Sequence, residues 1–243
     1  MKQTIFTITE NTALTATVYK MVLAGDTDGI TTGQFVNILL DGLYLRRPIS
    51  VCDCQGNTLT LLYKVVGKGT AQMAAMIAGQ TLDVLTGLGN GYDLSKAGDH
   101  PLLLGGGVGV PPLYMLARQL RQQGKAVSVV LGFNAKDEVF YEQEFKDLGC
   151  DVTVTTADGS HGVKGFVTDA LPADYSYFYT CGPEPMLKAV YRATTTSGQF
   201  SFEERMGCGF GACMGCSCKV ITGYKRICKD GPVLEKEEIL WDA

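Results

Sequence analysis

The feature that most constrains this chain is a group of cysteines near its carboxyl end. Cys208, Cys213, Cys216 and Cys228 follow the spacing C-x4-C-x2-C-x11-C, and five of the nine cysteines lie in the last 36 residues. Thiols this close together are prone to oxidation unless a ligand occupies them. The segment therefore predicts a metal centre.

A 2Fe–2S cluster is the centre that this spacing favours. Cysteine thiolates hold such clusters, and C-x4-C-x2-C with a distant fourth cysteine is the plant-ferredoxin spacing. Glycine lets backbone N–H groups approach inorganic sulfide closely, and four glycines surround the ligands: Gly207, Gly209, Gly211 and Gly215. A zinc site, which usually uses paired C-x2-C knuckles, and disulfides stay open as alternatives. Cys218 follows Cys216 too closely to be a further ligand, and we expect it to be a buried small residue on a strand.

The composition excludes several other classes of protein. The chain has 243 residues, 46% of them hydrophobic, and a net charge of −4, which argues against a nucleic-acid partner. No stretch reaches the roughly 18 apolar residues of a membrane span. The first residues alternate like a strand and lack the apolar core of a signal peptide, so we expect a cytoplasmic protein whose thiols are reduced.

Residues 1–97 predict a small antiparallel β-barrel. β-branched residues alternate over 4–9, 12–22, 34–41 and 58–66, with turn signals between them. Pro48 suits a strand edge, flanked by the Arg47 cation and the Ser50 hydroxyl. A glycine turn leads through Gly69 and Thr70 into a predicted helix over 71–78, with Thr70 as its N-cap, and helix starts of this kind bind anions. These two places together predict a bound dinucleotide, whereas each alone is equally explained by a surface arginine and an ordinary turn.

Residues 98–198 alternate between strands and helices, which predicts a doubly wound parallel sheet. Ligands of such sheets bind at the carboxyl ends of the strands, where two loops are expected, over 105–111 and 181–185. The first is a glycine run between an apolar strand and a helix. The second begins with Cys181, whose residue type alone also suits a buried core thiol. We expect His100 and His161 to be structural.

These signatures resemble the ferredoxin-reductase family of FAD- and nicotinamide-binding proteins. Arg-Pro-Ile-Ser and Gly-x-Gly-Thr stand in the barrel, and Gly-Gly-Gly-Val-Gly-x-Pro-Pro and Tyr-x-Cys-Gly-Pro in the α/β region. With the C-terminal cysteines, which we assign to a third domain over 199–243, the whole chain resembles the electron-transfer subunits of type B dihydroorotate dehydrogenase. The reductase pattern has tyrosine where Ile49 stands, so this position departs from a plain ferredoxin reductase.

The resemblance implies a role for each motif. It assigns FAD to three sets of residues: Arg47, Pro48, Ile49 and Ser50; Leu62, Tyr63 and Lys64; and Gly69 and Thr70. It assigns the nicotinamide cofactor to Gly106, Gly107, Gly109, Cys181, Gly182 and Pro183. It assigns the 2Fe–2S cluster to Cys208, Cys213, Cys216 and Cys228.

The resemblance also implies an oxidoreductase subunit that converts two-electron into one-electron transfer. Electrons would pass between NAD(H), FAD, the cluster and the FMN of a catalytic subunit, which oxidises dihydroorotate to orotate, with two copies of each subunit. The chain offers no acid–base pair for substrate chemistry, so no catalytic residue is predicted. The small subunit of a ferredoxin:NADP oxidoreductase, a sulfide dehydrogenase and a zinc-binding scaffold remain alternatives. We expect Glu235, Glu237, Glu238 and Trp241 to form a solvated tail with one buried aromatic, or else to contact a partner.

Overall fold

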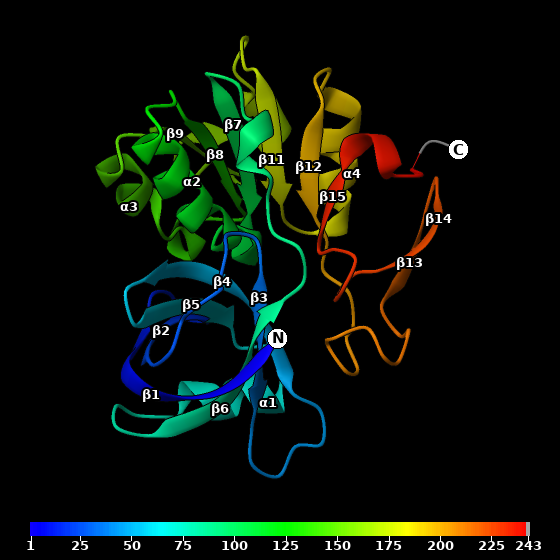
Figure 1. Ribbon diagram of the computed structural model, residues 1–243. Helices are drawn as coiled ribbons and strands as arrows, with labels where there is room; N and C mark the ends of the chain where they lie inside the picture. Colours follow the sequence, from blue (N-terminus) through cyan, green and yellow to red (C-terminus); the bar gives the residue numbers. More distant parts are fainter. Residues whose placement is uncertain (242–243) are drawn as a thin grey trace.

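The computed structural model describes residues 1–241, which form a barrel, a seven-stranded sheet and a two-stranded sheet (Figure 1). The six barrel strands close in the order β1-β2-β5-β4-β3-β6. Their bounds are β1 (Lys2–Ala13), β2 (Val18–Ala24), β3 (Phe35–Leu39), β4 (Arg47–Gln55), β5 (Thr58–Lys64) and β6 (Thr81–Leu88), with helix α1 (Lys68–Ala74) before β6. No helix among these described residues is long and apolar enough to cross a membrane.

Alternating side chains build the barrel. On β3, Val36 and Ile38 are completely buried and join the barrel core, whereas Phe35 and Asn37 lie on the outer face of the same strand. The antiparallel barrel predicted from alternation is thereby confirmed. The predicted strand over 12–22 is interrupted: β1 continues to Ala13, and a turn over 14–17, in which the Thr15 hydroxyl accepts a hydrogen bond from the Val18 amide (3.1 Å), separates it from β2.

The second sheet has the order β10-β9-β8-β7-β11-β12-β15. Its strands are β7 (Pro101–Gly106), β8 (Ser128–Phe133), β9 (Asp151–Thr156), β10 (Val163–Lys164), β11 (Tyr177–Cys181), β12 (Gly198–Ser201) and β15 (Val233–Glu235). All neighbours are parallel except β12 and β15. Helices α2 (Pro112–Gln122) and α3 (Glu142–Asp147) cover one face, and α4 (Glu184–Ala193) covers the other. The predicted doubly wound sheet is confirmed.

The barrel and the large sheet share a buried interface. Leu62 of the barrel belongs to the same apolar cluster as the face of the sheet that α2 covers. Next to it, Arg118 of α2 donates hydrogen bonds to Asp53 Oδ1 (2.6 Å) and to the Cys54 carbonyl (3.0 Å). This ion pair joins the two sheets by charge as well as by apolar burial.

The C-terminal segment leaves the large sheet and returns to it. After β12 the chain forms the cysteine segment and the hairpin β13 (Ser217–Val220) and β14 (Gly223–Arg226), and then pairs back onto β12 as β15. The predicted domain boundary at 198/199 falls inside β12. The aromatic predicted to be buried is half-buried: Trp241 packs edge-on against Phe200 and Tyr191.

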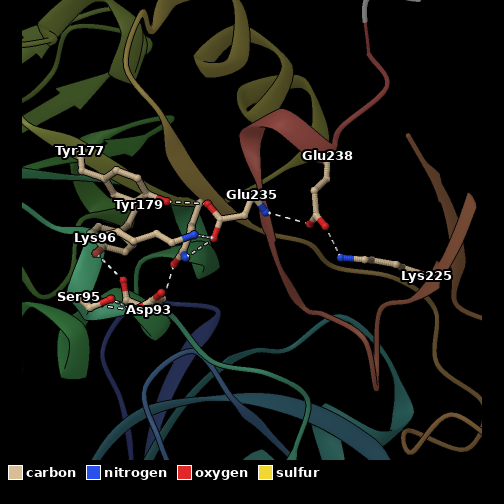
Figure 2. Close-up of polar contacts among 9 residues, drawn as sticks. Asp93, Ser95, Lys96, Tyr177, Tyr179, Lys225, Glu235 and Glu238 are labelled. Atoms are coloured by element: carbon tan, nitrogen blue, oxygen red, sulfur yellow. Dashed lines mark hydrogen bonds and ion pairs between the residues drawn. The ribbon is translucent and has the colours of Figure 1, made fainter. Parts of the chain in front are cut away.

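The expectation of a solvated acidic tail is wrong for Glu235. Its carboxylate accepts hydrogen bonds from Lys96 Nζ (2.7 Å), Gln199 Nε2 (2.8 Å) and the Tyr177 hydroxyl (2.8 Å). Figure 2 shows this carboxylate between the connection from the barrel, β11 and the turn that carries Glu238. Glu235 therefore joins three parts of the fold.

Candidate functional site

The residues assigned to FAD lie where two barrel strands part. Strands β4 and β5 pair from Gln55–Thr58 up to the Val51–Leu61 pair, where their ladder ends. Beyond it, residues 47–50 pair with β3, and residues 62–64 pair with β2. The two predicted stretches thus border the same opening in the barrel wall. Pro48 suits this edge, since it has no N–H to donate to a neighbouring strand.

Helix α1 closes the end of this opening. A Cβ atom at Gly69 would lie 2.2 Å from Arg47 Nε, so the arginine side chain crosses the bare backbone of the helix start. The structure therefore brings Arg47 and Gly69 into contact, which their spacing in sequence did not require.

The helix prediction itself needs correction. Helix α1 spans Lys68–Ala74 rather than 71–78, and Gly67 rather than Thr70 is its N-cap. The Thr70 hydroxyl nevertheless accepts hydrogen bonds from the Val66 amide (2.9 Å) and the Gly67 amide (3.2 Å). The Thr70 hydroxyl thus satisfies amides at the helix start from a position inside the first turn. A hydroxyl residue of this kind is also typical of an N-cap, and the sequence therefore placed the helix start about one turn too far along the chain.

Tyr63 faces the barrel interior. Its hydroxyl donates to Asn11 Oδ1 (2.9 Å), and its ring stacks on Tyr19 with centroids 5.9 Å apart. Burial raises the pKa of the Tyr63 phenol to about 12, so it stays protonated at neutral pH. Successive strand residues point to opposite faces, so Leu62 and Lys64 face the other way. A ligand in the opening therefore meets the backbone of residue 63 rather than its ring.

The two predicted nicotinamide loops meet at the carboxyl ends of neighbouring strands. Gly105 of β7 pairs with Cys181 of β11, and the chain on each side continues into a loop. A Cβ at Gly109 would lie 2.3 Å from the Cys181 carbonyl oxygen and 2.5 Å from the Gly182 nitrogen. The loops thus touch backbone to backbone, which requires glycine at 109. Gly107 has φ +52, and a Cβ built on it would meet no other atom within 4 Å, so this side of its backbone is open to a ligand.

The Cys181 thiol has a raised pKa. Burial raises its pKa to about 12, against a smaller lowering by a hydrogen bond with Ser201. The thiol is therefore protonated at neutral pH and offers volume and polarizability rather than charge.

A cavity of about 280 Å³ lies beside the second loop. Its walls include Gly182 and Pro183 on one side and Phe202, Lys219 and Trp241 on the other. The nicotinamide loop and the C-terminal segment therefore border the same space.

The four predicted cluster ligands form two pairs of thiols. Cys213 lies beside Cys208, and Cys228 lies beside Cys216. Among residues 1–241, no three His, Cys, Asp or Glu side chains form one metal-holding group. The four-ligand set therefore stays a prediction.

The chemistry of the segment fits an iron–sulfur cluster. The amides of Ala212 (3.2 Å) and Phe210 (3.5 Å) donate to Cys208 Sγ, and the Cys228 amide donates to Cys216 Sγ (3.4 Å). Burial raises the pKa of Cys208, but the hydrogen bonds from these amides and from Cys213 lower it by more, so that its pKa is about 6. Thiolate is the form that binds iron, and N–H groups directed at sulfur stabilise its charge.

The loop conformation depends on its glycines. Gly209 and Gly211 have φ +79 and +90, a region that side chains disfavour. Cys218 lies on β13, as predicted, half-buried against the apolar cluster that contains Cys216 and Cys228.

Sequence reasoning missed two polar residues with distant partners, the buried Asn37 and the half-buried Glu235. Asn37 contacts Cys208 from 171 residues away, and Glu235 contacts Lys96 from 139 residues away. No motif or periodicity within a short stretch of sequence predicts either contact.

Two family models match the chain. The iron–sulfur cluster binding domain of dihydroorotate dehydrogenase B matches residues 203–240, and the oxidoreductase NAD-binding domain matches residues 103–192. Both matches cover segments in which the sequence predicted the corresponding cofactor.

Whole-chain relatives carry one name. The dihydroorotate dehydrogenase B (NAD(+)), electron transfer subunit of Geobacillus sp. (strain WCH70) is 42% identical, over 99% of both chains. The protein of that name from Fusobacterium nucleatum subsp. nucleatum is 47% identical, over 93% of this chain and 94% of its own.

Solved structures share the fold. An NADH-dependent reduced ferredoxin-NADP oxidoreductase, studied for flavin-based electron bifurcation, superposes with a TM-score of 0.89 at 31% identity, over 98% of this chain and 90% of its own. A ferredoxin NADP+ reductase from Neisseria gonorrhoeae with bound FAD and NADP reaches a TM-score of 0.69 at 17% identity, over 79% of this chain and 90% of its own. The second likeness shows the fold alone.

Proposed function

Because this chain belongs to the family of dihydroorotate dehydrogenase B electron transfer subunits, we propose that it passes electrons between NAD(H) and a catalytic partner through FAD and a 2Fe–2S cluster. The family predicted from the sequence motifs is confirmed. The observation that carries the proposal is the cysteine segment. Its cysteines have the sequence spacing of iron–sulfur cluster ligands, and backbone amides donate hydrogen bonds to two of their sulfur atoms. When bound, FAD supplies two-electron exchange with a nicotinamide, and the cluster supplies one-electron transfer.

The proposed partner is an FMN-containing subunit that oxidises dihydroorotate to orotate, in an assembly with two copies of each chain in the cytoplasm. The relatives' name, electron transfer subunit, supports a separate catalytic chain. The sequence supports it too, since it offers no acid–base pair for substrate chemistry.

For FAD, the proposed residues act mainly through backbone and charge. Arg47 supplies a cation beside the opening between β4 and β5, and Ser50 supplies a hydroxyl. Gly69 leaves room for the Arg47 side chain, so a phosphate near it would meet both the guanidinium and backbone amides. Thr70 holds this turn through its hydroxyl.

For the nicotinamide cofactor, we propose NADH rather than NADPH. Strand β8 ends at Phe133. In sheets of this kind, a residue near the end of this strand distinguishes the ribose 2′-hydroxyl of NAD from the 2′-phosphate of NADP. Asn134 Nδ2 donates there to the Glu138 carboxylate (2.8 Å), which would repel a 2′-phosphate. Lys136 is the cation nearest in sequence, and rates with NADH and NADPH decide between the two.

We propose three functional regions: 1–97 for FAD, 98–198 for the nicotinamide cofactor and 199–243 for the cluster. The cluster region would present the thiols of Cys208, Cys213, Cys216 and Cys228, while the half-buried Cys218 packs behind them.

The test is replacement of a single ligand. In protein purified without air together with its partner, Cys213→Ser should remove the visible absorbance of the cluster and electron transfer to the partner, while reduction of FAD by NADH continues. Cys218→Ala is the matched control and should retain iron, absorbance and transfer. A Cys213→Ser protein that reduced the partner at the normal rate would refute the ligand assignment.

The small subunit of a ferredoxin:NADP oxidoreductase is the second candidate, favoured by the similarity to the NADH-dependent reduced ferredoxin-NADP oxidoreductase over nearly the whole chain. The identity of the co-purifying subunit separates the two functions: an FMN-containing dihydroorotate dehydrogenase supports the first. Purified protein containing zinc but neither iron nor flavin would contradict both.

A further inference from the structure

The outer face of strand β3 lies between the proposed flavin opening and the cysteine segment. Strand β3 pairs directly with residues 47–50 of β4. On its outer face, Phe35 belongs to the same buried apolar cluster as Cys216 and Cys228. Two residues further along the same face, Asn37 contacts the other half of the cysteine segment.

Asn37 makes this second contact through its amide group. Its Nδ2 donates to the Cys208 carbonyl (3.3 Å). A Cβ at Gly209 would lie 2.3 Å from the same nitrogen, so the loop after Cys208 lies directly on the Asn37 side chain. A side chain at 209 would separate the two, and the φ of +79 at this position already disfavours one.

Asn37 is also fixed from behind. Its backbone carbonyl accepts a hydrogen bond from Arg46 Nη1 (3.3 Å), and the same nitrogen pairs with Asp83 Oδ1 (2.8 Å). Opposite Asn37 in the sheet is Pro48, which belongs to the proposed flavin residues and has no N–H. The Asn37 side chain thus stands between a proposed flavin-lining strand and a predicted cluster ligand.

The burial of Asn37 argues against a role in stability alone. The residue is 1% exposed, and its Oδ1 has no hydrogen-bond partner among residues 1–241. A buried polar atom without a partner destabilises a fold, and an apolar residue of similar size would remove that penalty. A stable barrel therefore does not need an amide here.

We propose that Asn37 is a positioning residue for electron transfer, whose amide holds Cys208 and Gly209 at a fixed separation from the flavin strand β4. The inference rests on the proposed function and adds a residue outside the assigned cofactor ligands. Groups that hydrogen-bond to the surroundings of metal ligands orient those ligands, and their removal commonly lowers metal affinity or activity about 10–100-fold.

The experiment compares Asn37→Leu with Thr32→Val in protein carrying FAD and the cluster. Thr32 is the matched control, since it is also buried, in the turn before β3, with an unpartnered side-chain oxygen. Three properties are measured: iron loss to a chelator, the electron paramagnetic resonance signal of the reduced cluster, and single-turnover transfer from NADH-reduced flavin to the cluster.

We expect Asn37→Leu to lose iron about tenfold faster than the wild type, because the ligand loop is no longer held. For the same reason, its electron transfer from flavin to cluster should be about tenfold slower. Its resonance signal should shift, while its Tm and its rate of flavin reduction by NADH stay at or above the normal values. Thr32→Val should match the wild type in iron loss, signal and transfer.

A second variant covers the case in which Asn37→Leu does not fold. Gly209→Ala moves the loop away from the unchanged Asn37 and should alter iron loss, signal and transfer in the same direction. Normal iron loss, signal and transfer in either folded variant would overturn the role of Asn37. Wild-type protein without flavin or iron would instead refute the proposed function, so the two failures are distinguishable.

Discussion

The contacts of Glu235 predict a measurable loss of stability when its charge is removed. In Glu235→Gln, one carbonyl oxygen remains as an acceptor for Lys96 and Gln199, which share one carboxylate oxygen, and the NH2 group takes the place of the oxygen that accepts from the Tyr177 hydroxyl; the opposite orientation would lose two donors instead of one. Gln199 and Tyr177 are 3% and 6% exposed, so the donor that loses its acceptor stays buried.

The magnitude follows from these contacts. A hydrogen bond to a charged group contributes about 1.5–3 kcal/mol, and one such bond is lost. The Lys96 side chain is 44% exposed, so its ion pair adds at most about 1 kcal/mol. We expect a total loss of about 2 kcal/mol, which lowers the Tm of a chain of this size by about 4–8 °C.

The same carboxylate gives the effect a pH dependence. Burial raises the pKa of Glu235, but hydrogen bonds from Lys96, Gln199 and Tyr177 lower it by more, so that its pKa lies below its ordinary value. A lowered folded-state pKa means that the carboxylate stabilises the fold above its unfolded-state pKa, about 4.3, and loses this effect as pH falls through the folded-state value. The difference between wild type and Glu235→Gln should therefore shrink below pH 4.

The assay is thermal and urea unfolding at pH 7 and at several acidic pH values. Glu237→Gln is the matched control, since it makes the same change two residues away on an exposed side chain and should leave Tm within about 1 °C, as surface substitutions usually do. Equal Tm values for both variants and the wild type at pH 7, or a difference that grows in acid, would refute the reasoning.

Three further substitutions probe the interface and the cofactor loops. Arg118→Ala leaves the Asp53 carboxylate buried without its partner and should destabilise the protein by about 3 kcal/mol in urea unfolding; an unchanged midpoint would contradict this. Gly109→Ala forces apart the loops that meet at Cys181 and should raise KM for NADH about tenfold or more with FAD content unchanged; a normal KM would count against the loop assignment. Tyr63→Phe should retain FAD and lose about 1 kcal/mol of stability, since its hydroxyl faces Asn11; loss of FAD would show that the hydroxyl reaches the cofactor.

Local patterns predicted the elements that depend on near neighbours in sequence. The apolar strand, glycine loop and helix around Gly107 are contiguous, and their spacing alone indicated β7 and α2. The two cofactor loops could also be paired, because the carboxyl ends of parallel strands meet at one edge of a sheet.

Contacts between distant segments could not be predicted in this way. Strand β15 has three residues, too few for an alternation to be detected, and its pairing with β12 depends on a chain reversal through the cysteine segment. Without that pairing, nothing in the sequence distinguishes Glu235 from the exposed Glu237. The sequence predicts no more for Asn37 than a place in the strand over 34–41, because only the fold brings Cys208 to its side chain.

The cysteine segment is held from both sides, which bears on how it transfers electrons. Near its end, the Asn90 amide of the connection from the barrel donates to the Gly231 carbonyl (2.6 Å), and the Phe202 amide donates to the Pro232 carbonyl (2.9 Å). Near its start, Asn37 holds Cys208. Hydrogen bonds at both ends restrict the segment. We therefore expect the polypeptide itself to set the separation between the flavin opening and the thiols, so that substitutions at residues that touch neither cofactor, such as Asn37, change the rate of transfer between them.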